Sequence, residues 1–270
     1  MFSVLFQTSL LALFLFFAYE SPAIASTSNK VSVSADYLFF KHENYNVKDE
    51  TLNSEKGWIP GLQVAYKSIS KNLEGIALLE KYTGDVSFDG IATNGPFSSK
   101  TNEDLTRFSY RLNAEQSRSD YNFYTLLSFH NLRRNILSTA SISGREYQYQ
   151  WLSLEGGVTV DLYSTRKNVI SAEFGLSRTL FSKLQIDLSK NNLGKPVLRL
   201  GDKFGGSASL TYKHMFNRYN GVNLLLQIKY WQFGKSESKS ITNDSTTEMI
   251  TEPQSQSLST ALGIGYFYKF

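Results

Sequence analysis

The chain ends in the sequence SLSTALGIGYFYKF, residues 257–270, in which large apolar residues alternate with small or polar ones. One face of this segment, if extended, carries Leu262, Ile264, Tyr266, Tyr268 and Phe270. The other face carries Ala261, Gly263, Gly265 and Lys269, with Phe267 as the exception. A period of two indicates a β-strand whose two faces meet different surroundings. The sequence therefore predicts that the chain finishes on an amphipathic strand.

The same alternation recurs along the rest of the chain. It predicts ten strands, at 31–42, 57–69, 73–84, 104–115, 120–131, 146–162, 168–182, 203–216, 221–234 and 257–270. The third is the weakest, because Glu74, Ile76, Leu78 and Glu80 blur its alternation. After residue 25, no apolar run reaches the roughly 18 residues that a membrane helix requires.

The connections between these strands alternate in length. The short ones are 70–72, 116–119, 163–167 and 217–220, and the long ones are 43–56, 85–103, 132–145, 183–202 and 235–256. Outer-membrane barrels have this asymmetry, with tight periplasmic turns and long extracellular loops. A sheet in lipid must close, because open edges leave backbone groups without partners. The fold class that we predict is all-β: an antiparallel up-and-down transmembrane β-barrel of ten strands.

The N-terminus has the pattern of an export signal. Residues 1–19 carry no charge and are rich in Leu and Phe, and the small-residue motif Ala23-Ile24-Ala25 follows Pro22. This predicts a signal peptide at 1–25, cleaved after Ala25, and one barrel domain at 26–270 in the bacterial outer membrane. No Lys or Arg precedes the apolar stretch, so an uncleaved membrane anchor remains the alternative.

The terminal strand resembles that of Gram-negative outer-membrane β-barrel proteins, which typically end in Phe after alternating aliphatic or aromatic residues. The residues that carry the resemblance are Leu262, Ile264, Tyr266, Tyr268 and Phe270. The resemblance implies that these residues are the assembly signal read by the barrel-assembly machinery. It also implies that outer-membrane lipid and lipopolysaccharide surround the protein. In architecture the chain is similar to the ten-stranded omptin proteases and opacity-type adhesins.

Composition excludes several kinds of chemistry. The chain has no Cys, which removes thiol nucleophiles, thiolate metal sites and disulfides. Its net charge of +4 comes without any Lys/Arg run, so we expect no nucleic-acid partner. The three histidines, His42, His130 and His214, are dispersed and give no metal-ligand spacing. We therefore predict no cofactor and no metal.

Catalytic patterns are incomplete. Omptins combine two acidic residues with an Asp-x-His pair; Asp85 and Asp89 could supply the acidic side, but no His follows an Asp at that spacing. Ser128 and His130 share a strand face, as a Ser–His nucleophile pair would. Their parity places them in the lumen, however, away from lipid acyl chains. We predict that the chain is not an enzyme; a protease or lipid A-modifying enzyme is the third alternative.

The polar parity of the strands predicts a charged lumen. Its charges include Arg107, Arg111, Glu155, Glu173, Lys213 and Lys229. Because both signs are present, we expect an ion-paired, hydrated interior. The alternative is a small porin or channel for modest solutes, with Arg107, Arg111, Lys213 and Lys229 favouring anions.

Basic residues cluster in the third and fourth long connections. We predict that Arg133, Arg134, Lys190, Lys195 and Arg199 contact lipopolysaccharide phosphates or other anionic groups. The fifth connection, 235–256, is rich in Ser and Thr and should be exposed. The leading functional prediction is a surface barrel that serves adhesion or other surface interaction, with a host or surface ligand, or envelope integrity.

Overall fold

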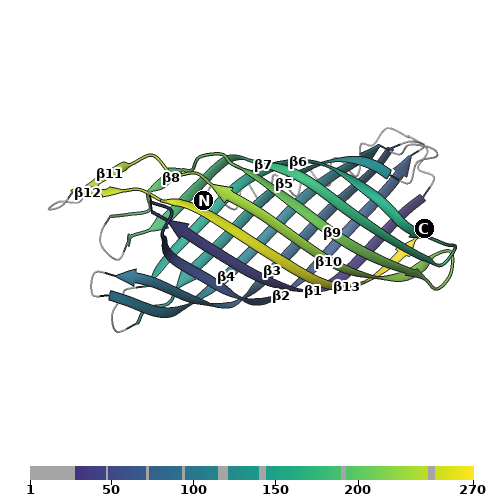
Figure 1. Cartoon of the computed structure of the whole chain (residues 1–270), viewed down its shortest axis with the longest axis horizontal. Coiled ribbons are helices and arrows are strands. Elements are labelled where there is room, and N and C mark those ends of the chain that lie inside the picture. The colour runs from purple at the N-terminus through teal and green to yellow at the C-terminus, as the bar shows by residue number, and fades with distance from the viewer. Residues whose placement is uncertain are drawn as a thin grey trace.

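Ten long antiparallel strands form a closed barrel (Figure 1). The computed structural model describes residues 28–46, 48–70, 73–92, 95–114, 121–139, 144–189, 193–242 and 247–270, so the predicted signal peptide lies outside the described residues. The barrel strands are β1 (Ser28–Tyr45), β2 (Thr51–Ser70), β3 (Leu73–Ala92), β4 (Gly95–Ala114), β5 (Tyr121–Ile136), β6 (Arg145–Ser164), β7 (Asn168–Asp187), β9 (Phe204–Met215), β10 (Asn220–Phe233) and β13 (Gln254–Lys269). Three short strands lie in the connections: β8 (Val197–Arg199), β11 (Lys239–Thr242) and β12 (Thr247–Ile250).

The first and last barrel strands close the cylinder. The pairing order is β6-β5-β4-β3-β2-β1-β13-β10-β9-β7, and β6 pairs with β7. Where β1 meets β13, Asn29 and Phe270 exchange two backbone hydrogen bonds of 2.9 Å. The last residue of the chain therefore takes part in closure. Among the described residues there is no helix long and apolar enough to cross a membrane.

The two ends of the barrel differ. β1 begins and β13 finishes at one end of the barrel, where the C-terminus is marked in Figure 1. The β11–β12 hairpin lies at the opposite end. Even-stranded outer-membrane barrels keep their termini in the periplasm. We call the end with β11 and β12 the outer end.

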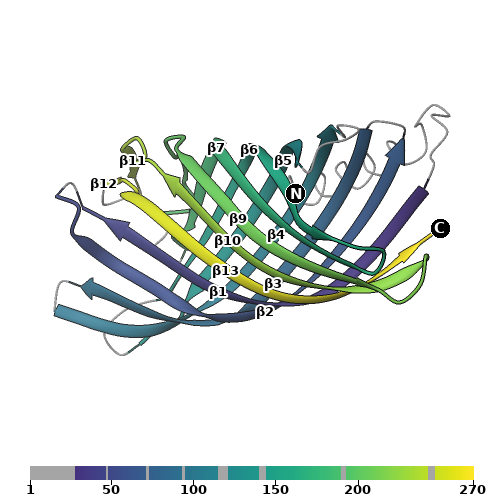
Figure 2. The same ribbon diagram turned by 45° about the vertical axis from the view of Figure 1, so that its right-hand side comes forward.

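All ten predicted strands are present, but the predicted long connections 43–56 and 85–103 are wrong. Only a short connection separates β1 from β2, and β3 and β4 run to Ala92 and from Gly95. Parts of 132–145 and 183–202 also belong to β5, β7 and β8. Figure 2 shows the long strands of this sheet running from one end of the barrel to the other.

The periplasmic half of the barrel is apolar outside and polar inside. Exposed apolar side chains form a band on the outside of the barrel wall. This band includes Val33, Tyr37, Leu62, Val64, Leu79, Tyr110, Phe123, Leu127, Leu154, Phe174, Leu210, Leu224, Leu226, Leu262 and Ile264. The alternate positions carry buried polar residues such as Glu80, Arg107, Ser128 and Glu155. This is the alternation of a strand with lipid on one side and a polar lumen on the other.

The outer half of the barrel has the opposite arrangement. On β3, Asp85 and Ser87 are exposed, whereas Tyr82, Val86 and Phe88 are buried. Other strands repeat this, with Phe40, Leu132 and Leu184 inside. Polar residues outside and apolar residues inside are the pattern of a β-barrel in water.

Strand length agrees with this division. β2, β3, β4, β6 and β7 have 20 residues each. At about 3.4 Å per residue and a tilt of about 40°, such a strand rises about 50 Å, roughly twice the apolar band of about 25 Å. The outer half therefore projects beyond the bilayer.

Phe267, the exception in the terminal strand, has a clear place. Its ring is 1 % exposed and faces the lumen, with the Lys30 ammonium 4.2 Å from the ring centroid. The ring requires Gly221, because a Cβ there would lie 2.6 Å from Phe267 Cζ. The five residues of the predicted assembly signal all face outward, from 47 % to 60 % exposed.

Candidate functional site

A group of aromatic rings crosses the lumen in the outer half. Phe40 from β1, Tyr149 and Trp151 from β6, and Trp231 and Phe233 from β10 form this aromatic plug. Ring centroids lie 6.2 Å apart for Phe40 and Trp231, 6.1 Å for the two tryptophans and 5.1 Å for Trp151 and Phe233. Such packing of large side chains leaves little space between them.

Outer connections cover the plug. Leu193, Leu198 and Leu200, in and around β8, are buried in the same hydrophobic cluster. Ile241 and Ile250, from the β11–β12 hairpin, pack against it. The described parts of the fourth and fifth predicted long connections, 183–202 and 235–256, therefore fold into the mouth of the barrel.

Four ionisable residues, which we call the outer ionic cluster, are buried beside the plug: Glu55, Glu103, Arg134 and Glu252. The Arg134 guanidinium forms an ion pair with Glu55 and lies 3.4 Å from Glu103. Thr101 donates to Glu55 at 2.8 Å, and the Tyr149 hydroxyl donates to Glu252 at 2.8 Å. One guanidinium thus faces three carboxyl groups away from water. Burial raises the pKa of Glu252, which favours its neutral form.

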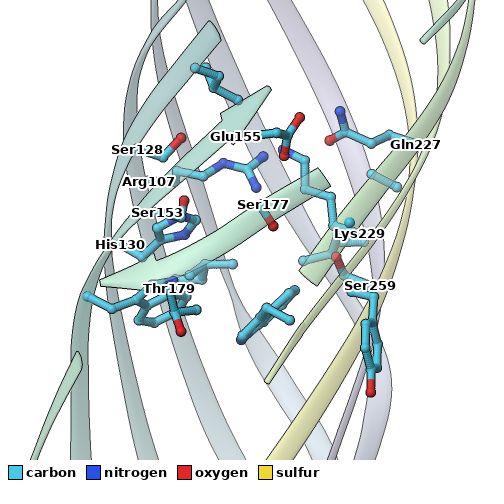
Figure 3. A pocket seen from close by; sticks show the side chains of 18 of the residues that line it. Arg107, Ser128, His130, Ser153, Glu155, Ser177, Thr179, Gln227, Lys229 and Ser259 are labelled. Atoms are coloured by element: carbon cyan, nitrogen blue, oxygen red, sulfur yellow. The ribbon is translucent and has the colours of Figure 1, made fainter. Parts of the chain in front are cut away.

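A small cavity of about 50 Å³, with polar and apolar residues in its wall, lies on the periplasmic side of the plug (Figure 3). Arg107, His130, Ser153 and Glu155 line it from one side, and Gln227, Lys229 and Ser259 from the other. Trp151 and Trp231 form part of its wall.

Ser128 and His130 both face the lumen, as the alternation predicts, but they do not pair with each other. Ser128 shares a 2.8 Å hydrogen bond with Ser109. His130 Nε2 lies 2.9 Å from Ser153 Oγ, and its ring stacks on Trp151 at 4.4 Å. A cavity of about 50 Å³ has no room for an acyl or peptide substrate beside this pair.

The predicted lumen charges lie on the inner face, and most have partners. Arg107 forms an ion pair with Glu80, and Arg111 lies 2.9 Å from Glu173. Glu155 accepts hydrogen bonds of 2.8 Å from Tyr124 and Ser207. Lys213 and Lys229 have no carboxylate within 4 Å among the described residues.

The predicted basic rim divides into different environments. Arg133 and Arg199 are exposed on the outer surface. Lys195 is 2.6 Å from Asp187, and this hydrogen bond raises the pKa of Lys195. Lys190 lies outside the described residues.

Arg134 departs from the prediction of a surface contact, because it is buried in the outer ionic cluster. The cause is strand geometry: residues 133 and 134 belong to β5, and successive side chains of a strand point to opposite faces.

Asp85 and Asp89, the candidate acidic pair, are on the outer surface, where they accept hydrogen bonds from Asn102 at 3.1 Å and Ser98 at 2.6 Å.

The sequence analysis predicts neither the plug nor the outer ionic cluster. Glu55, Glu103 and Glu252 fall in the predicted long connections. A signal for the plug was present, since Trp151, Trp231 and Phe233 occupy the inward parity of their strands. Three large aromatic residues at lumen positions indicate a filled interior rather than an open channel.

Comparisons with known proteins identify the fold. The outer membrane protease OmpT from Escherichia coli superposes with a TM-score of 0.58 at 9 % sequence identity, covering 93 % of this chain and 99 % of that one. The chain has the fold of a Gram-negative outer-membrane β-barrel. No family model and no curated protein sequence matches it.

Two further solved structures are similar at lower scores. The translocator domain of the autotransporter NalP from Neisseria meningitidis has a TM-score of 0.44 at 11 % identity, covering 98 % of this chain and 97 % of that one. The outer membrane protein OprG from Pseudomonas aeruginosa has a TM-score of 0.39 at 10 % identity, covering 91 % and 97 %. At these identities the likeness concerns the fold alone.

The outer ionic cluster predicts a sharp contrast between two adjacent arginines. Arg134→Met leaves buried carboxylates without their cation and should lower the stability of the folded barrel by about 3–5 kcal/mol. Arg133→Met removes an exposed charge from the same strand and should change stability by about 0.5 kcal/mol or less. The measurement is the temperature at which the folded form disappears in heat-modifiable gel migration. Equal effects of the two variants would contradict the assignment of Arg134 to the interior.

Proposed function

We propose that this protein is a closed outer-membrane barrel that acts through its projecting outer end, in surface interaction or envelope integrity, and that it does not conduct solutes at rest. The aromatic plug is the observation that carries this proposal. Export by a signal peptide at residues 1–25 is part of the same proposal.

The packing of the plug argues against a passive pore. Its rings come from three strands on different sides of the barrel, and segments of two outer connections pack over them. Opening a channel through the lumen would require the rings of the plug and the segments above them to move together. The cationic residues Arg107 and Lys229 below the plug favour the second candidate, a gated channel for small anions.

Single-channel recording in planar bilayers separates these two functions. The unmodified protein should give no conductance steps, whereas a variant with Trp151→Ala, Trp231→Ala and Phe233→Ala should open a narrow path. Trp58→Ala, which removes an exposed ring on the outer surface, is the control and should remain silent. Steady conductance by the unmodified protein would refute the closed-barrel proposal and favour the channel.

One patch on the outer surface supports a role in the envelope. Arg178, Lys183 and Arg199, which we call the boundary patch, are exposed, and no carboxylate of the described residues lies within 4 Å of any of them. Lys183 and Arg199 are paired in register on β7 and β8. Arg178 lies over the Phe204 ring at 5.5 Å, and Phe204 is 71 % exposed.

Cations beside exposed apolar side chains suit an amphiphile with phosphate groups. The apolar side chains can contact acyl chains, while the guanidinium and ammonium groups bind phosphate. We therefore assign the phosphates of lipopolysaccharide as the partner of the boundary patch. Arg199 is one of the residues that the sequence predicts for this role, and Arg178 and Lys183 are added here from the structure; the prediction for the exposed Arg133 stays a prediction.

Charge removal tests this assignment. Replacing all three residues of the boundary patch by Gln should weaken lipopolysaccharide binding by about tenfold or more, since one lost charged hydrogen bond is worth about 1.5–3 kcal/mol. The control makes the same change in charge at three exposed residues elsewhere on the outer end: Lys56→Gln, Lys100→Gln and Arg145→Gln. The measurement is lipopolysaccharide retained per folded barrel after detergent washing. Equal loss in both variants would show that net charge, and not this patch, determines binding.

A further inference from the structure

We propose that the cavity below the aromatic plug binds one small monovalent anion of halide size. This site lies inside the barrel and is independent of the boundary patch. The unsatisfied hydrogen-bonding groups of its wall, the charges around it and its size together carry the proposal.

The unsatisfied groups of the wall are donors. Trp151 and Trp231 both line the cavity, and neither indole Nε1 has a hydrogen-bond partner among the described residues. Trp151 is 2 % exposed, so water outside the barrel cannot serve its N–H group. Buried donors of this kind normally have an acceptor, and leaving one without a partner costs about 1–3 kcal/mol.

The charges that face the cavity also favour an anion. Lys229 lines it without a carboxylate within 4 Å among the described residues. Arg107, across the cavity, has two of its nitrogens engaged by Glu80. Glu155 is the carboxylate on the wall, and its Oε1 already accepts from the hydroxyls of Tyr124 and Ser207. Among the described residues, the ammonium of Lys229 therefore lacks a counter-ion within contact distance.

The size of the cavity limits the ligand. Its volume is about 50 Å³. A buried water needs about 10–15 Å³ of cavity volume. The cavity therefore holds roughly three to five waters, or one halide with water beside it. Sugars and long-chain carboxylates are too large. An anion accepts from several donors at once and neutralises Lys229, whereas water satisfies the indoles but leaves the charge.

The chain provides its own optical probe. It has three tryptophans, and Trp58 is exposed on the outer surface, so in a Trp58→Phe variant all tryptophan emission comes from the two cavity indoles. Iodide quenches indole fluorescence on contact. Titration with sodium iodide, at constant ionic strength with sodium gluconate, should give quenching that saturates. Sodium chloride should relieve it by displacement.

Two lysines on the inner face supply the matched variants. Lys229→Met, made in the Trp58→Phe background, should weaken iodide binding by about tenfold or more, as expected for one lost charged contact. Lys213→Met removes an inner-face lysine that does not line the cavity and should leave the titration unchanged. Heat-modifiable migration verifies that each variant is folded. Quenching that is absent, or that rises linearly without saturation and is indifferent to chloride, would overturn the proposal and leave a cavity that holds water alone.

Discussion

The structure depends on one constraint: the medium outside the barrel changes from lipid to water part-way along its long strands. Successive side chains of a strand point to opposite faces. When apolar residues face the medium outside, their polar neighbours therefore face the lumen, and the reverse also holds. Along the bilayer the outer face must be apolar, and charged residues such as Arg107, Glu80 and Glu155 occupy the lumen. Beyond the bilayer the outer face must be polar, and the apolar residues turn inward.

The aromatic plug follows from this inversion. Phe40, Tyr149, Trp151 and Phe233 lie where the barrel has left the lipid, and the hydrophobic effect drives them together as in a water-soluble core. The resulting packing also closes the lumen. No additional structural element is needed to close the barrel, because the apolar contacts that hold the projecting half together also fill the lumen.

Polar groups are buried in two places next to the plug. Beside it, acceptors predominate: Glu55, Glu103 and Glu252 lie around Arg134, and neither oxygen of Glu103 accepts a hydrogen bond from a described residue. Below it, Trp151 and Trp231, whose indole N–H groups have no hydrogen-bond partner among the described residues, line the cavity together with Lys229. Buried groups of this kind reduce stability compared with an apolar core of the same shape.

How much the sequence could predict follows from the same inversion. The ten strands, their order and the closed barrel were predictable, because residues such as Leu226 and Leu262 alternate with polar neighbours in the lipid zone. The extensions of β3 and β4 were not, because Asp85, Ser87 and Asn102 on their outer faces resemble loop residues. Arg134 was misplaced for this reason. The outer ionic cluster joins β2, β4, β5 and the connection before β13, and one sequence does not show which distant segments meet.

Chemical labelling along one strand tests the inversion directly. The chain has no Cys, so single cysteines report on their own positions without background. On β3, Leu79→Cys, Ser87→Cys and Val86→Cys place a thiol on the outer surface of the lipid zone, on the outer surface of the projecting zone and in its core. In phospholipid vesicles, a membrane-impermeant maleimide should label the thiol at position 87 rapidly and leave those at 79 and 86 unlabelled until the protein is unfolded. Rapid labelling at 79, or protection at 87, would contradict a barrel whose outer half stands in water.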